Sequence, residues 1–307
     1  MSNSKAVVYL KLLRAPFFTA SVVPILVGTA LAYSAGFAAS PVIFALALFS
    51  MIAFQAGANI SNDYFDHLSR NDWLNENATP FSGGSRVIQQ DLLSPGKVLK
   101  YAFIVFALGI IAGVAIVVMT KSFFVLTIGA IGLFGAYFYT ANPLKLGYRT
   151  AGEIMIGLLF GLLPVYGAYY IQTQSFDFVP VLPGAIVAVL IFQIILANEF
   201  PDFQADAAAG KKTIVVSCGI NKAAVIYKIC LLIIVGLTAV YSFSIANKVA
   251  GGILLLVSVA LSALCLKFAK PETLCKKGVF DLNRATVLLH LLVGLVLAAV
   301  CLLGQPV

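Results

Sequence analysis

The sequence predicts an all-α protein that crosses a membrane many times and forms one domain over residues 1–307. Hydrophobic residues make up 61% of the chain and charged residues only 10%, whereas a soluble domain carries about 25% charged residues. The apolar residues occur in runs of about twenty, which is the length that spans roughly 30 Å of hydrocarbon. A polytopic membrane protein is therefore expected.

Nine apolar runs follow one another along the chain, and each is expected to form a transmembrane helix. Ser94 and Pro95 precede the third run with the residue types preferred at a helix N-cap and first helical position. Asn142 and Pro143 are expected to stop the fourth run. The runs cover residues 16–36, 41–62, 98–118, 123–141, 151–172, 178–200, 223–243, 250–268 and 285–303.

The basic residues orient these helices. If nine helices alternate across the bilayer, 18 of the 20 Lys and Arg residues fall on the side of the N-terminus, and only Lys121 and Lys248 fall on the other. The positive-inside rule then predicts a cytoplasmic N-terminus and an external C-terminus. This topology and attraction to anionic lipid explain the net charge of +8. No nucleic-acid partner and no obligatory protein partner are inferred.

The acidic residues gather in two segments, and acids close to a membrane usually have a function. Each segment begins at the cytoplasmic end of an apolar run, the second and the sixth, and each contains the pattern Asn-x-x-x-Asp. The repetition suggests two pseudo-repeats, with motifs near residues 59–72 and 198–213. Eight of the 12 acids lie in the two segments, the first of which continues past its motif: Asp63, Asp66, Asp72, Glu76 and Asp91 in the first, and Glu199, Asp202 and Asp206 in the second.

The spacing of the motifs predicts a metal-bridged anion site. Residues four apart lie on one helix face about 6 Å from each other, so Asn62 with Asp66, and Asn198 with Asp202 and Asp206, form columns of oxygen ligands. All-oxygen sites suit Mg²⁺, which shares its coordination shell with phosphates. Two facing columns would repel each other without cations between them. A Mg²⁺-bridged diphosphate fits this geometry better than a pair of solvated helix caps, because the motifs match.

Basic residues accompany both motifs. Arg86 follows Gly83 and Gly84, whose backbone N–H groups can approach phosphate. Positive-inside signalling explains Lys211 or Lys212 equally well when either is taken alone. The loop at about residues 67–97 is too polar for the bilayer and long for a connector, so a lid is expected. The predicted diphosphate contacts are Asn62, Arg86, Arg149, Asn198, Lys211 and Lys212.

Both motifs resemble those of the UbiA superfamily of intramembrane prenyltransferases, most closely the 1,4-dihydroxy-2-naphthoate prenyltransferases. The resemblance rests on Asn62-Asp63-Tyr64-Phe65-Asp66, Thr79-Pro80-Phe81-Ser82-Gly83-Gly84-Ser85-Arg86-Val87, Tyr139-Thr140-Ala141-Asn142-Pro143-Leu144, Asn198-Glu199-Phe200-Pro201-Asp202 and Gly210-Lys211-Lys212-Thr213. It extends over nearly the whole chain and implies about nine helices around a central cavity. It also implies a bacterial or archaeal cell membrane, with the site facing the cytoplasm.

The resemblance implies that Mg²⁺ assists ionisation of a polyprenyl diphosphate, after which an aromatic acceptor, 1,4-dihydroxy-2-naphthoate of menaquinone biosynthesis, is alkylated. The implied metal ligands are Asn62, Asp63, Asp66, Asp72, Asn198, Asp202 and Asp206. The implied catalytic residues are Asp66, Tyr139, Lys145, Asp202 and Asp206, with the Tyr139 ring able to support an allylic cation. Many relatives carry a third aspartate where this chain has Arg70, and Asp72 is its candidate replacement. Asn59 and Asp63 form a competing register for the first site.

Three other functions remain open from the sequence. One is transfer to another acceptor, such as 4-hydroxybenzoate, homogentisate, haem or a glycerol phosphate ether. Another is a phosphoalcohol transferase, whose compact aspartate pattern is missing from this sequence. The third is a cation-coupled carrier, but carriers favour acids near mid-membrane, and here the acids lie at helix ends.

Overall fold

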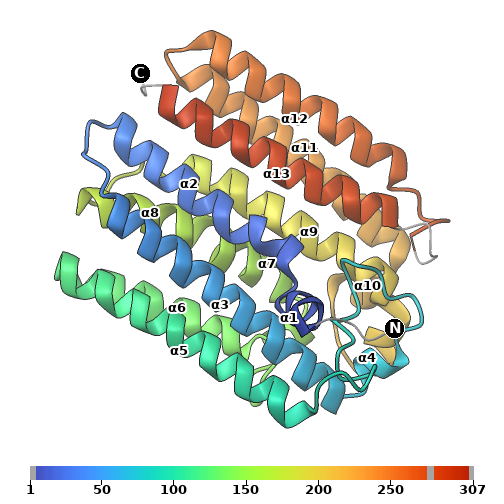
Figure 1. Ribbon diagram of the computed structural model, residues 1–307. Helices are drawn as coiled ribbons and strands as arrows, with labels where there is room; N and C mark the ends of the chain where they lie inside the picture. The colour runs from blue at the N-terminus through green and yellow to red at the C-terminus, as the bar shows by residue number, and fades with distance from the viewer. Residues whose placement is uncertain (1–4, 275–279, 304–307) are drawn as a thin grey trace.

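The computed structural model describes residues 5–274 and 280–303, and within these residues the chain folds into helices without strands (Figure 1). This confirms the all-α fold class. Eight helices are long and apolar enough to cross a membrane, and α6 is a shorter apolar helix. The nine correspond to the nine predicted runs: α2 (Thr19–Ser34), α3 (Pro41–Leu68), α5 (Pro95–Thr120), α6 (Phe123–Phe138), α7 to α8 (Gly152–Thr173), α9 (Val181–Ala208), α11 (Ile220–Ser244), α12 (Lys248–Phe268) and α13 (Phe280–Leu303).

Polar residues set where several of these helices begin. The Ser40 hydroxyl accepts a hydrogen bond from the N–H of Ile43 at 3.4 Å, and Pro41 follows at the first helical position. Ser122 caps α6 in the same way, through the N–H of Val125. Such caps satisfy backbone donors that the first helical turn leaves free.

The helix ends differ from the sequence prediction where polar residues continue a helix. Helices α3 and α9 extend to Leu68 and Ala208, beyond the predicted ends at residues 62 and 200, so both acidic motifs are helical. The fourth helix ends at Phe138, before Asn142-Pro143. Three short helices were not predicted: α1 (Lys5–Leu13), α4 (Asn71–Leu74) and α10 (Ile214–Cys218).

The helices form a bundle in which α9 occupies the centre. In Figure 1, α11 to α13 lie on one side of α9, and α3, α5 and α6 lie on the other. Helix α9 contacts α2, α7, α8, α10, α11 and α13, and α3 packs along α5. The short helices α1, α4 and α10 gather at one end of the bundle, which is called the motif end below (Figure 1).

Two glycines allow the fifth span to pack closely against α9. A Cβ on Gly157 would lie 2.8 Å from the carbonyl oxygen of Ala188, and one on Gly161 would clash with the backbone of the same residue. Small residues spaced by four let membrane helices approach closely. The fifth span also contains a π-helical turn, η3 (Leu158–Leu162), between α7 (Gly152–Gly157) and α8 (Leu163–Thr173).

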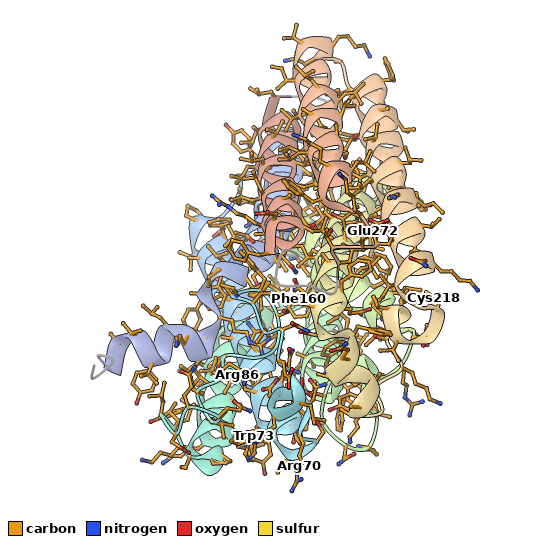
Figure 2. The ribbon with its side chains drawn as sticks, turned by 90° about the vertical axis from the view of Figure 1, so that its right-hand side faces the viewer. Arg70, Trp73, Arg86, Phe160, Cys218 and Glu272 are labelled. Carbon is orange, nitrogen blue, oxygen red and sulfur yellow. The ribbon has the colours of Figure 1, made fainter. Side chains whose placement is uncertain are left out.

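The distribution of surface residues suits a lipid environment. Side chains such as Phe123, Phe178 and Leu256 are 80%, 89% and 68% exposed. Such exposure of large apolar groups is typical of surfaces that face lipid. Lys121 and Lys248 lie where α5 ends and α12 begins, at the end of the bundle opposite to the motif end (Figure 1). The view in Figure 2 shows Arg70, Trp73 and Arg86 at the motif end.

Candidate active site

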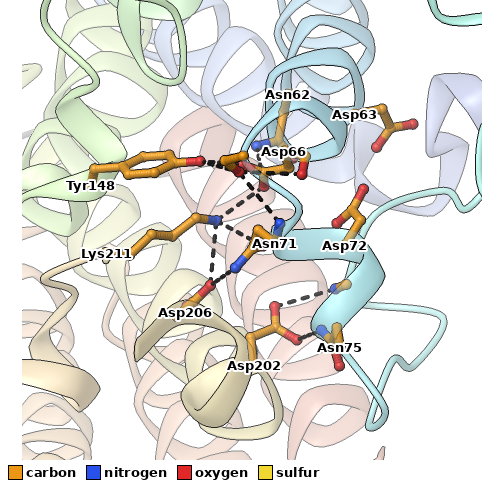
Figure 3. Close-up of polar contacts among 12 residues, drawn as sticks. Asn62, Asp63, Asp66, Asn71, Asp72, Asn75, Tyr148, Asp202, Asp206 and Lys211 are labelled. Carbon is orange, nitrogen blue, oxygen red and sulfur yellow. Dashed lines mark hydrogen bonds and ion pairs between the residues drawn. The ribbon is translucent and has the colours of Figure 1, made fainter. Parts of the chain in front are cut away.

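Asp66 on α3 lies at the centre of a hydrogen-bond network at the motif end (Figure 3). Its Oδ1 accepts a hydrogen bond from the Tyr148 hydroxyl at 2.9 Å. Its Oδ2 accepts hydrogen bonds from Asn62 Nδ2 and from Lys211 Nζ, both at 3.0 Å. The contact between Asn62 and Asp66 is the one that their spacing of four on a helix predicts.

The aspartates of the second motif meet the loop that follows α3. Asp206 Oδ1 accepts a hydrogen bond from Asn71 Nδ2 at 2.9 Å. Asp202 accepts hydrogen bonds from Asn75 Nδ2 at 2.7 Å and from the backbone N–H of Gly83 at 3.2 Å. The loop is therefore folded over the motifs and tied to α9 by two amide side chains.

Lys211 joins the two motifs. Its Nζ lies 3.0 Å from Asp66 Oδ2, 3.3 Å from Asp206 Oδ1 and 3.1 Å from Asn71 Oδ1. Burial alone would lower the pKa of Lys211, but the charges of Asp66 and Asp206 raise it well above its ordinary value. A permanently charged ammonium group thus occupies the position between the two columns where a cation was predicted.

Asn59 and Asp63, the alternative pair of candidate ligands on α3, face the chain before α2 and the loop after α3. Asp63 Oδ1 lies 2.5 Å from a guanidinium nitrogen of Arg14 and accepts a hydrogen bond from the N–H of Ser85 at 3.1 Å. Asn59 Nδ2 donates to the carbonyl oxygen of Leu13. In Figure 3, Asp63 lies apart from Lys211. The structure therefore directs Asn62 and Asp66 toward the second motif, and Asn59 and Asp63 toward the chain before α2.

Asp72 belongs to α4 and is 1% exposed. Burial raises its pKa to about 8, and the charges of Asp66 and Asp63 add to the effect. Gly84 lies against its carboxylate, where a Cβ would clash, and the positive φ of Gly84 also favours glycine. Arg70, at the position of the third aspartate in many relatives, is exposed.

Asn283 on α13 positions Asn198. Pro201 lies inside α9 and has no N–H, which leaves the carbonyl of Ala197 without its helical partner. Asn283 Nδ2 donates to that carbonyl at 3.2 Å and to Asn198 Oδ1 at 2.6 Å. One buried amide thus repairs the break in α9 and fixes the first residue of the second motif.

A polar cavity of about 130 Å³ lies between the motifs. Its lining includes eight of the predicted site residues: Asn62, Asp66, Asp72, Tyr139, Asn198, Asp202, Asp206 and Lys211. The other five lie outside the lining: Asp63, Arg86, Lys145, Arg149 and Lys212.

Three of the four basic residues outside the lining have other partners for their side chains. Arg86 donates to the backbone carbonyls of Asp72 and Asn75, so it organises the loop. Lys145 lies over the ring of Tyr148 at 4.9 Å. Arg149 donates to the carbonyl of Leu144 and, like Lys212, is exposed.

Four residues that contact the motifs were not predicted as site residues: Arg14, Asn71, Asn75 and Tyr148. Asn71 and Asn75 carry a detectable signal, because they repeat the spacing of four found in both motifs. Topology alone accounts for the charge of Arg14 at the sequence level, and nothing local links it to Asn62, which follows 48 residues later.

The donor set fits a divalent metal in its chemistry. The columns offer carboxylate and amide oxygens, which are the ligands that Mg²⁺ prefers. Lys211 shows that the acids already hold a cation where the columns meet. Among the described residues, no three acidic, histidine or cysteine side chains gather in a metal-binding arrangement. The candidate ligands are instead paired with Lys211, Asn71 and Asn75.

The fold and the site define a polytopic membrane protein with a buried acidic cavity, at one end of its bundle, that holds cations. The family is shown by comparison with known proteins: the model of the UbiA prenyltransferase family matches residues 21–276. The chain belongs to this family and is a prenyltransferase.

Curated relatives and solved structures agree with this assignment. The chain is 30% identical over 258 residues to a 1,4-dihydroxy-2-naphthoate octaprenyltransferase of Haemophilus influenzae, which covers 81% of this chain and 80% of the relative. A Bacillus subtilis protein of the same name is 29% identical over 209 residues, covering 68% and 65%. A UbiA homolog from Archaeoglobus fulgidus bound to DMAPP and Mg²⁺ superposes with a TM-score of 0.69 at 18% identity, covering 95% and 99%. This last match supports the fold.

Proposed function

We propose that this prenyltransferase transfers a polyprenyl group from its diphosphate to 1,4-dihydroxy-2-naphthoate. The observation that carries the proposal is the meeting of two acidic columns at one cation, Lys211, inside a buried polar cavity. The acceptor follows from the names of the relatives from Haemophilus influenzae and Bacillus subtilis. The diphosphate and Mg²⁺ follow from the ligands of the Archaeoglobus fulgidus homolog.

Asn62, Asp66, Asn198, Asp202 and Asp206 would hold the metal, since they combine oxygen donors with a place in the cavity lining. Bound Mg²⁺ would supply positive charge that stabilises the departing diphosphate. Lys211 and Arg14, which both line the cavity, would add hydrogen bonds to the diphosphate oxygens.

In the proposed reaction the bond between prenyl C1 and the diphosphate oxygen breaks, and its electron pair leaves with the diphosphate. A π electron pair of the acceptor ring then forms the new carbon–carbon bond, and the ring expels the proton or carboxyl group from the alkylated carbon. Tyr139 can stabilise the allylic cation with its ring face. Burial raises the pKa of Tyr139, with the charges of Glu199 and Glu153 adding to the effect, so the phenol stays protonated.

Water must be excluded from this cation, and the fold provides two means. The loop after α3 covers the cavity through contacts of Asn71 and Asn75 with α9. A second cavity, of about 270 Å³, lies among α2, α3, α5, α6 and α8 and is lined almost entirely by apolar residues. We propose that it takes part of the prenyl chain, which is apolar along its whole length.

A labelled prenyl diphosphate, offered to the purified protein with a panel of acceptors, tests the function. The panel contains 1,4-dihydroxy-2-naphthoate, 4-hydroxybenzoate and homogentisate. We expect Mg²⁺-dependent prenylation of the naphthoate at a kcat/KM well above that of the other two. Prenylation of another acceptor in preference would overturn the acceptor, and diphosphate release with none would overturn the transfer.

A further inference from the structure

The hydroxyl of Thr140 lies in the polar cavity without a hydrogen-bond partner among the described residues. Thr140 lies directly after Tyr139, is 2% exposed and lines the cavity, yet its Oγ1 has no hydrogen-bond partner in residues 5–274 or 280–303. Buried hydroxyls are rarely left without a partner. The other described lining residue with such an atom is Arg14, at Nε, and its guanidinium is already paired with Asp63. The Thr140 hydroxyl is therefore available to a ligand.

Glu199 lines the same cavity but stands apart from the acidic column beside it. It follows Asn198 and is therefore turned by about 100° around α9. Its Oε2 accepts a hydrogen bond from the N–H of Val215 at 3.3 Å, its carboxyl group is also hydrogen-bonded to that of Glu153, and it forms none of the ion pairs found in the described chain. A carboxyl group in this position brings no positive charge to a diphosphate, but it can accept a hydrogen bond from a hydroxyl.

Rigid neighbours hold this part of the cavity in place. Glu153 on α7 accepts a hydrogen bond from the N–H of Ile214 at 2.6 Å, so the start of α10 is fastened to α7 by Glu153 and to α9 by Glu199. The Tyr139 ring lies against Gly147, where a Cβ would come within 2.6 Å of the ring. Thr140 and Glu199 are thus presented by packed elements.

We propose that Thr140 and Glu199 bind a ring hydroxyl of the aromatic acceptor, at a subsite separate from the diphosphate site in the same cavity. The hydroxyl accepts a hydrogen bond from Thr140 and donates one to Glu199. This pairing selects hydroxylated rings, because an acceptor without the hydroxyl leaves the buried Thr140 hydroxyl unsatisfied. The inference rests on the proposed transfer to an aromatic acceptor and adds the residues that recognise it.

Two variants at one position test the subsite. Thr140→Val removes the hydroxyl and keeps the shape, and Thr140→Ser keeps the hydroxyl. We expect Thr140→Val to raise the KM for 1,4-dihydroxy-2-naphthoate about tenfold, which corresponds to about 1.4 kcal/mol, and Thr140→Ser to restore it. The KM for the prenyl diphosphate should stay within about twofold. An unchanged acceptor KM, or an equal rise for both substrates, would overturn the subsite.

Acceptor analogues identify the hydroxyl that is bound. The analogues 1-hydroxy-2-naphthoate and 4-hydroxy-2-naphthoate each lack one hydroxyl, and their binding to the Mg²⁺-loaded protein can be measured by calorimetry. We expect Thr140→Val to weaken one analogue about tenfold and to leave unchanged the one that lacks the bound hydroxyl. Equal weakening of both, or of neither, would contradict the proposal.

These binding measurements also separate the two proposals. If no naphthoate is prenylated but one analogue still responds to Thr140→Val, the subsite stands and the proposed transfer fails. If the naphthoate is prenylated and Thr140→Val matches the wild type for the acceptor and both analogues, the transfer stands and the subsite fails.

Discussion

At the scale of single residues, Lys211 compensates the negative charges of the two acidic motifs. Its side chain is 11% exposed, and its ammonium group contacts acids from two helices, Asp66 on α3 and Asp206 on α9. Removing one partner of a buried ion pair leaves an uncompensated charge, which costs about 3–5 kcal/mol. Lys211 therefore performs in the metal-free protein the charge compensation that a divalent ion would provide.

Lys211→Met should lower the thermal stability of the metal-free protein in detergent, because Asp66 and Asp206 would then face each other without a cation. Mg²⁺ should restore much of the loss. Lys212→Met is the matched control, since Lys212 is exposed and its side chain forms no contact that the site requires. Equal unfolding temperatures for the two variants would contradict the role assigned to Lys211.

Asp72 makes the stability of the folded protein depend on pH. Its pKa is about 8 in the folded protein, against 3.8 ordinarily, because burial and the charges of Asp66 and Asp63 oppose ionisation. The unfolded chain therefore binds fewer protons between these values, and stability falls as the pH rises through this window. The unfolding temperature of the metal-free protein should decrease from pH 5 to pH 8.5, and Asp72→Asn should flatten part of that slope. An unchanged slope would show that Asp72 is already ionised at pH 5.

At the scale of elements, the second motif lies in a part of α9 where one backbone hydrogen bond is missing. Pro201 has no N–H to donate to the carbonyl of Ala197 four residues earlier in α9, and α13 supplies the missing donor through Asn283. The same amide holds Asn198 at 2.6 Å. The orientation of the second motif thus depends on a helix that carries none of its acids.

Asn283→Ala should reduce stability by about 1–3 kcal/mol, the penalty for leaving a buried acceptor unsatisfied, and should lower the rate of prenyl transfer. Adding Pro201→Ala provides an internal control, because alanine returns an N–H that can bond to Ala197. We expect the double variant to regain stability but not turnover, since Asn198 still lacks its partner. Denaturation and turnover measured on the three variants check this, and a double variant no more stable than Asn283→Ala would disprove the repair.

The helices themselves are predictable from the sequence, but their polar extensions and the contacts between them are not. The length and polarity of each apolar run predict a helix, and a spacing of four predicts that Asn62 contacts Asp66. The extension of α3 and α9 was not predicted, because the polar residues there are stabilised by tertiary partners. Asn71, the first residue of α4, donates a hydrogen bond to Asp206, which lies 135 positions later in the sequence. No local pattern encodes such a pairing.

On the scale of the whole molecule, the bundle has the motif end and an opposite end, and a lysine marks each of them. Lys222 lies near the start of α11 at the motif end, and Lys248 starts α12 at the opposite end. The positive-inside rule predicts that the motif end faces the cytoplasm, because 18 of the 20 Lys and Arg residues are expected on that side.

Labelling of single cysteines tests this orientation. In a variant without the native cysteines, Lys222→Cys and Lys248→Cys should react with a membrane-impermeant maleimide from opposite sides. We expect Lys248→Cys to be labelled in intact cells and Lys222→Cys only after the membrane is opened. Both residues are exposed, so access to the reagent is not limited by packing. Labelling of both in intact cells, or the reverse pattern, would refute the topology.

If the facing carboxylates hold a cation-bridged diphosphate, Asp202→Asn should abolish prenyl transfer without unfolding the protein. Asparagine has nearly the same volume, and its side-chain oxygen can still accept a hydrogen bond from Asn75 or Gly83, so the fold should survive. The measurement is Mg²⁺-dependent prenyl transfer by Asp202→Asn, with helical content and unfolding temperature compared with the wild type. We expect at least a hundredfold loss of turnover, which corresponds to about 2.7 kcal/mol of transition-state stabilisation, with the fold intact. Near-normal Mg²⁺-dependent transfer by this variant would contradict the account.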